Sequence, residues 1–237
     1  MGSKYRSHYV SFMNVRLGDS GNHLLETGNK ADIVDEAVSH YSKYFPDTET
    51  VDITGDGTAT YVLPTNWVQG FSQALQLEFP QGYQNPAYMK SYRLMEYYDV
   101  TAAAWKLRFI DITPSSSQKL RLQFSKPHSV TDVASTIPDS NFTAVASLAV
   151  SKAALALAGR SLSQQDSRIE ADVFHFRTVA SQYQSFAKVM FEEHFCKALG
   201  INPDGDGYAT AIFDIEHRLT GGWLPIARGR QSYSRGS

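Results

Sequence analysis

The chain has 237 residues, of which 42% are hydrophobic, and its formal net charge at pH 7 is −2. This length suits one large domain or two small ones, and the apolar fraction is sufficient for a core. A net charge this close to zero argues against tight nucleic-acid binding, which depends on neutralising phosphates. The single cysteine, Cys196, excludes an internal disulfide and a cysteine-based zinc site.

We expect no membrane partner. Residues 1–18 lack the apolar segment and the cleavage site of a signal peptide. The most apolar run, residues 142–158, is mostly alanine and contains Ser147, Ser151 and Lys152, so it does not resemble a membrane span.

The first 28 residues are rich in Gly, Ser and Asn and show no hydrophobic period. We therefore predict that residues 1–28 form a leader that is flexible or ordered by a partner.

A first helix is predicted over residues 30–45. Its first turns carry Asp32, Asp35 and Glu36, where the helix dipole favours negative charge, and Pro46 ends it.

Residues 49–126 alternate apolar and polar side chains, which is typical of antiparallel strands with one solvated face. Two hairpin turns are predicted, one at Gly55-Asp56-Gly57 and one at residues 113–117, the latter joining the last two strands. Residues 88–100 fit either an aromatic strand or a short helix.

Helical periodicity returns over residues 141–162 and 169–199. The first of these segments is apolar nearly all round and is predicted to be the most buried helix. The second has a 4-3 seam from Ile169 to Met190, and Gly200 ends it. The predicted fold is α+β, with a three-helix body over residues 29–200 and a small antiparallel sheet inserted into it.

Residues 201–237 are predicted to form an extended C-terminal arm, because their apolar side chains follow neither a helical nor a strand period for long. Such a segment must lie against a folded surface, and we expect that surface to belong to a neighbouring subunit; the alternative is that the arm wraps its own body. Four arginines and no acid follow His217, so the tip is either a solvated end or a basic contact for an acidic surface. The predicted arm contacts are Tyr208, Ile212, Phe213, Ile215, Leu219, Trp223, Leu224, Ile226, Arg228, Arg230 and Arg235, with Arg218 as the fourth arginine.

We find no motif for catalysis, a cofactor or a metal, and we predict that the protein is not an enzyme. The seven histidines form no metal-binding pair, and His194 is expected to pack in the seam of the last helix. Cys196 is expected to be a small buried residue. Residues 159–161 resemble a nucleophile elbow only superficially. Residues 202–207 resemble the start of a calcium loop, but Phe213 stands where that loop needs glutamate, so we favour a turn.

A cluster of tyrosines lies between the predicted sheet elements, and it could stack sugars or bases or form a protein contact. Because little positive charge surrounds it, the protein contact is favoured. Its members are Tyr88, Tyr92, Tyr97 and Tyr98.

Several short motifs, which we interpret as structural turns and strand ends, follow one another along residues 31–200. They are Asp35-Glu36-Ala37-Val38, Val51 to Gly57, Leu63-Pro64 with Trp67 and Gly70-Phe71-Ser72, Leu77 to Pro80, Phe124 to His128, and Ile169 to Asp172. In this order the segments resemble head-to-tail connector (adaptor) proteins of tailed bacteriophages, and the matching motifs include no catalytic residue.

This resemblance implies a subunit of the phage neck, made in the host cytoplasm and located in the virion. In that family the subunits form a ring, commonly twelvefold, that binds the portal, extends the DNA channel and presents a surface to tail, stopper or terminator proteins. The channel would contact genomic DNA only transiently, and we expect acidic side chains from the group Asp32, Asp35 and Glu36 to face its lumen. The alternatives are a tail-completion or stopper subunit and a glycan- or nucleic-acid-binding module.

Overall fold

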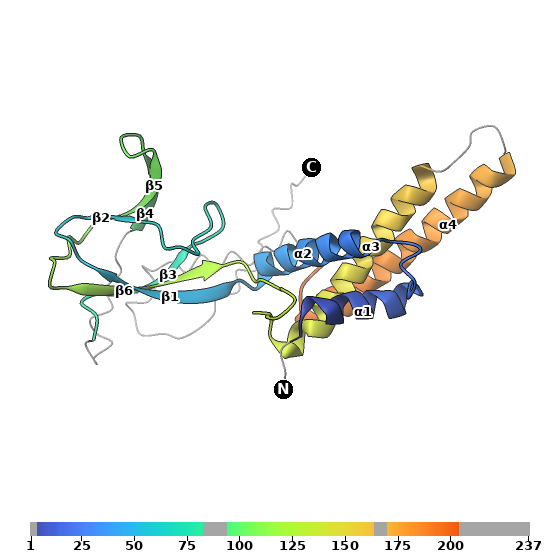
Figure 1. The fold of residues 1–237 in the computed structure, drawn as a ribbon, viewed down its shortest axis with the longest axis horizontal. Helices are drawn as coiled ribbons and strands as arrows, with labels where there is room; N and C mark the ends of the chain where they lie inside the picture. The colour runs from blue at the N-terminus through green and yellow to red at the C-terminus, as the bar shows by residue number, and fades with distance from the viewer. Residues whose placement is uncertain (1–3, 83–93, 164–169, 204–237) are drawn as a thin grey trace, which may run out of the picture. The chain divides into compact units, whose positions relative to one another are not determined.

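The computed structural model describes residues 4–82, 94–163 and 170–203 and confirms an α+β fold (Figure 1). The chain divides into two compact units. We call the first the helical unit (residues 1–50, 64–74 and 123–211) and the second the strand unit (residues 51–63, 75–122 and 212–237).

The helical unit contains four principal helices among the described residues. They are α1 (Arg6–Leu17), α2 (Thr27–Tyr44), α3 (Phe142–Ser163) and α4 (Glu170–Val189), and α4 continues through a π-helical segment, Met190–Cys196, into α5 (Lys197–Leu199).

The strands form two separate three-stranded sheets, whereas we predicted a single small sheet. The first has the order β1-β6-β3 and the second the order β2-β5-β4. Their bounds are β1 Asp47–Thr54, β2 Thr60–Val62, β3 Ala74–Glu78, β4 Leu94–Asp99, β5 Ala104–Phe109 and β6 Lys119–Lys126. The aromatic segment that fitted either a helix or a strand is, in its described part, the strand β4.

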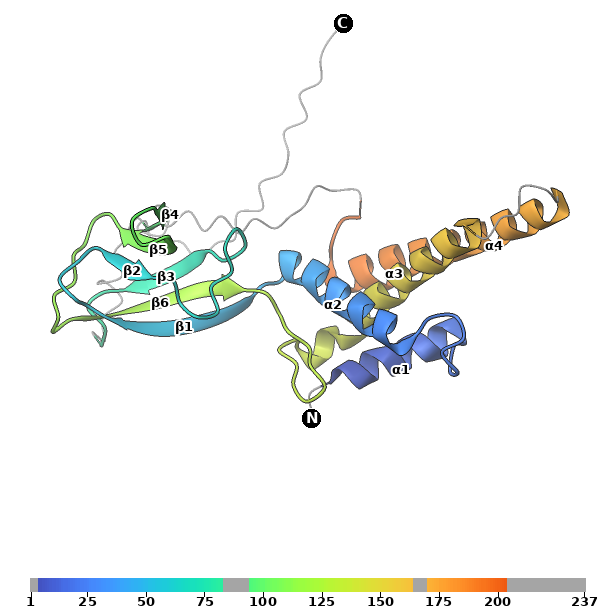
Figure 2. The ribbon, with the colours of Figure 1, turned by 45° about the horizontal axis from the view of Figure 1, so that its top comes forward.

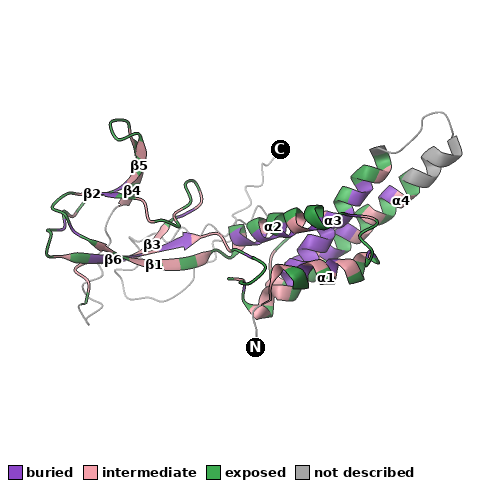
Figure 3. Ribbon diagram, viewed as in Figure 1, coloured by how far each residue is buried: buried purple, intermediate pink, exposed green. Residues whose placement is uncertain are grey.

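Helix α3 is the centre of the helical core, as its apolar composition predicts (Figure 3). Its buried residues, such as Val145, Ala149 and Ala153, face α1, α2 and α4. Residues 139–162 form the one helix, within the described ranges, that is long and apolar enough to cross a membrane, but 67% of its most apolar window is buried inside the protein. Packing against three helices accounts for this apolar surface without a bilayer.

The predicted leader is wrong for residues 6–17, because they form α1, which packs along α2 and α3 (Figure 2). Tyr9 and Met13 are fully buried, and the Tyr9 ring lies 4.7 Å from that of Phe142. The signal was present but short: Tyr9 and Met13 are four residues apart, and Gly18 ends the helix with φ +66.

Neither predicted hairpin exists. Strands β1 and β2 lie in different sheets, and so do β5 and β6. The two turns instead contact each other, since Gly55 N donates to Gln118 O at 2.8 Å and Gly57 N donates to Pro114 O at 2.9 Å. A Cβ at Gly55 would lie 2.2 Å from Ser115 O, so this contact requires glycine.

The predicted seam of the last helix is confirmed for the side chains described between residues 177 and 190. Ala180, Ala187 and Met190 are buried, and Tyr183 is half-buried. Beyond it the π-helical segment changes the register, because its wider turn places an extra residue on the helix.

That change of register puts Phe195 and Cys196 in the core and leaves His194 exposed, so the predicted packing role of His194 is wrong. The prediction for Cys196 is confirmed: it is a buried free thiol, and burial raises its pKa.

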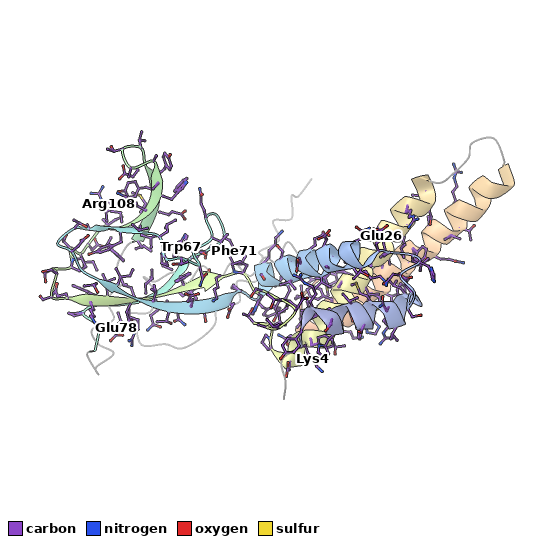
Figure 4. The ribbon with its side chains drawn as sticks, in the orientation of Figure 1. Lys4, Glu26, Trp67, Phe71, Glu78 and Arg108 are labelled. Atoms are coloured by element: carbon purple, nitrogen blue, oxygen red, sulfur yellow. The ribbon has the colours of Figure 1, made fainter. Side chains whose placement is uncertain are left out.

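The segment between β2 and β3 contains motifs on which the family resemblance rests. Ser72 closes a turn by accepting from Val68 N at 2.8 Å, and its own N donates to Val68 O at 2.8 Å. The Trp67 ring lies 5.3 Å from that of Phe124 on β6 (Figure 4), and Gln73 N donates to Ser125 Oγ at 2.8 Å. These contacts hold the segment between β2 and β3 against β6.

Candidate interaction surfaces

The β4–β5 hairpin of the strand unit carries an exposed apolar tip (Figures 1 and 3). Tyr98 and Trp105 are directly opposite each other in the strand register, and their rings make an edge contact with centroids 5.5 Å apart. Both rings are exposed, and Val100 in the connecting loop is 82% exposed. Such a group of large apolar side chains is what a protein-binding surface presents.

The shape of this tip is held by Asp99. Its Oδ1 accepts from Thr101 N at 2.9 Å and from Ala102 N at 3.2 Å, and its Oδ2 pairs with Lys106 Nζ at 2.7 Å. The hydrogen bond from Lys106 lowers the pKa of Asp99 and raises the pKa of Lys106, so both stay ionised and their charges cancel. The tip is therefore a pre-organised, electrically neutral protrusion.

An aromatic pair on a pre-shaped loop is suited to anchoring in an apolar pocket of another protein, because little side-chain freedom is lost on binding. Arg108 is exposed on the other face of the same hairpin (Figure 4). The neutral tip offers no cluster of positive charge for a phosphate backbone.

The predicted tyrosine cluster does not form one surface within the described part of the chain. Tyr97 and Tyr98 are neighbours on β4, so their side chains point to opposite faces of the sheet. Tyr98 pairs with Trp105 instead, whereas Tyr88 and Tyr92 lie outside the described residues. The contact between Tyr98 and Trp105 was not predicted, because it depends on the strand register that places the two residues opposite each other.

The arm residues predicted as interface contacts, from Tyr208 to Arg235, also lie outside the described residues. The arm and its partner surface therefore remain a prediction.

Two of the three acidic side chains predicted to face a lumen are paired within the helical unit. Asp35 Oδ1 lies 2.7 Å from Arg6 of α1, and Glu36 Oε1 lies 2.7 Å from Lys152 of α3. Asp32 is exposed. The charges of Asp35 and Glu36 are therefore compensated within the helical unit.

The histidines on α2 and in the loop after β6 are packing residues. His40 stacks on Phe191 at 6.2 Å and lies beside Phe195, and His128 lies 2.9 Å from Thr136 Oγ1 and beside the ring of Tyr41. Burial lowers the pKa of both histidines. No group of three His, Cys, Asp or Glu side chains suited to a metal occurs among residues 4–82, 94–163 and 170–203.

Comparison of the chain with models of protein families and with curated proteins gave no match.

Proposed function

We propose that the chain is a structural subunit of the neck of a tailed bacteriophage, in which copies form a ring that joins the portal to the tail and extends the DNA channel. The sequence motifs of residues 31–200 that resemble the adaptor family support this assignment. The main structural support for a binding role is the neutral apolar tip formed by Tyr98, Val100 and Trp105.

This role needs docking surfaces and no catalytic centre. A ring subunit contacts its neighbours through two different flanks, and further surfaces must meet the portal and the tail. The hairpin tip would serve one of these contacts, and the predicted arm over residues 201–237 would serve another.

The test is direct binding. Purified full-length chain is mixed with portal rings of the phage that encodes it and separated by sedimentation, and the complexes are examined by electron microscopy. We expect a regular ring of the chain on the portal. Binding to tail components with none to the portal would indicate the tail-completion or stopper role, and saturable binding to glycans or single-stranded DNA would indicate a binding module.

Removal of the predicted arm provides a second prediction. A chain that ends at Asn202 is expected to keep the helical content and unfolding transition of the full chain but to bind the portal at least about tenfold more weakly, because interface side chains are lost. Circular dichroism and sedimentation measure the two properties. Unfolding of the truncated chain would show that the arm belongs to its own core.

The hairpin tip gives a third prediction. Trp105→Ala is expected to weaken binding to the portal or to the tail components by about tenfold or more, because exposed aromatic anchors dominate binding energy. The free energy of unfolding should change little. Val133→Ala, at an exposed position of the helical unit, is the matched control. If both variants bind every neck partner as the unmodified chain does, the tip is not a docking element.

A further inference from the structure

The turn between α1 and α2 surrounds a fully buried lysine. Lys30, in the first turn of α2, is 0% exposed, and Asp19 is 1% exposed. The Lys30 Nζ lies 2.6 Å from Asn14 Oδ1, 2.7 Å from Asp19 Oδ2, 2.8 Å from Asn22 Oδ1 and 3.2 Å from Asp19 O. Buried lysines are rare, and here four oxygens converge on the charge.

The backbone of the turn is organised around the same group. Asp19 Oδ1 accepts from Leu24 N at 2.9 Å, and Asp19 Oδ2 accepts from Leu25 N at 3.0 Å. Asn22 has φ +54, a left-handed conformation that places its side chain against the ammonium. Burial alone would raise the pKa of Asp19, but the hydrogen bonds from Leu24, Lys30 and Leu25 outweigh it and hold the pKa well below its usual range.

The set of oxygen acceptors around Lys30 Nζ matches an ammonium better than other cations. An ammonium is a compact charge with three donors, which neutral amide and carbonyl oxygens satisfy together with one carboxylate. A calcium ion requires six to eight oxygens and usually several carboxylates, whereas this turn offers a single carboxylate. A guanidinium is planar and larger, so it does not fit oxygens that converge on one point.

We infer that the α1–α2 turn is a binding cage for an ammonium group, filled by Lys30 from within the chain, and that its occupancy holds α1 against α2 and α3. Asn14 belongs to α1, Asp19 and Asn22 to the turn, and Lys30 to α2, so the ammonium joins all three segments. An empty cage leaves the Asp19 carboxylate buried without its cation, which strongly favours undocking of α1.

The cage can be emptied and refilled. Lys30→Ala removes three methylene groups and the ammonium, and these are replaced atom for atom by n-propylammonium. The full-length variant is expected to have a folding equilibrium constant lower by roughly 100-fold or more, since one partner of a buried charge pair is missing. Added n-propylammonium chloride should restore stability in a saturable manner and restore the slow hydrogen exchange of the α1 amides.

Matched controls separate the cage from general effects. Sodium chloride and tetramethylammonium chloride at equal ionic strength should not restore Lys30→Ala, because neither donates hydrogen bonds. Lys30→Met fills the stem without the charge and should be destabilised but insensitive to n-propylammonium. Asn14→Ala and Asn22→Ala in the Lys30→Ala background should weaken the rescue.

Three results would overturn the inference. One is Lys30→Met with the stability and α1 exchange of the unmodified chain, since the charge would then be unnecessary. Another is equal rescue by tetramethylammonium. The third is a Lys30→Ala chain that n-propylammonium neither stabilises nor, if the variant is unfolded, returns to its folded state.

Discussion

Replacing Met13 with aspartate is expected to lower the free energy of unfolding of the helical unit by about 4 kcal/mol or more, enough to unfold it in water. The side chain is 0% exposed and lies in the core beside α3, so an aspartate there would be a buried charge without a partner. Urea unfolding followed by the helical circular dichroism signal measures the change.

The matched control lies two residues further along the same helix. Val15 is 82% exposed, and Val15→Asp is expected to change the free energy of unfolding by less than about 0.5 kcal/mol. Similar small effects of both substitutions would mean that residues 6–17 do not pack as α1 and that the leader predicted from composition is correct.

Gly55→Ala should destabilise the strand unit by about 3 kcal/mol, because the new Cβ meets backbone atoms. It would lie 2.2 Å from Ser115 O and 2.7 Å from Pro114 O. Ser115 O accepts from Gln118 N at 2.9 Å and Pro114 O accepts from Gly57 N at 2.9 Å, so moving either carbonyl would disturb a hydrogen bond. Thermal unfolding, with hydrogen exchange at Gly55 and Gly57 as a local probe, checks this result.

Glycine replacements elsewhere should behave differently. A Cβ at Gly159, in the interior of α3, meets nothing within 4 Å, so Gly159→Ala should stabilise the helical unit by up to about 1 kcal/mol. At Gly57 there is also open space, but φ is +84, so alanine should cost about 1 kcal/mol. If Gly55→Ala costs no more than Gly57→Ala, the two turns do not pack closely.

Helices α2, α3 and α4 were predicted from hydrophobic periodicity, because each has a long apolar face in its sequence. Helix α1 was missed since it is only 12 residues long and contains several polar residues. Its helical state depends on packing against α3, as short helices are marginal by themselves.

The strands were also predicted from alternation, but the two hairpin pairings predicted for them are wrong. Alternation records which face of a strand is solvated, and it contains no information on which other strand supplies the hydrogen bonds. The turns at residues 55–57 and 113–117 have hairpin composition, yet each joins one sheet to the other, and their mutual hydrogen bonds replace the expected strand pairing.

For the candidate sites too, the sequence indicates single residues but not the contacts between them. In the sequence, Trp105 alternates with the polar Lys106, which indicates an apolar strand face. Its contact with Tyr98, however, follows from the β4–β5 register. Asn14, Asp19, Asn22 and Lys30 attract no notice in the sequence, because polar residues near a glycine are typical of an exposed turn.

By itself, the sequence determined the α+β class, the helical segments with long apolar faces, the buried state of Cys196 and the strand character of β1, β2, β3, β5 and β6. Only the tertiary structure decided that there are two sheets, that α1 joins the core, that a π-helical segment turns His194 outward, and that Lys30 is enclosed by oxygens. The reason is physical: local patterns report the burial of each side chain, whereas strand pairing, helix register and charge pairing depend on residues that are distant in the chain and meet only on folding.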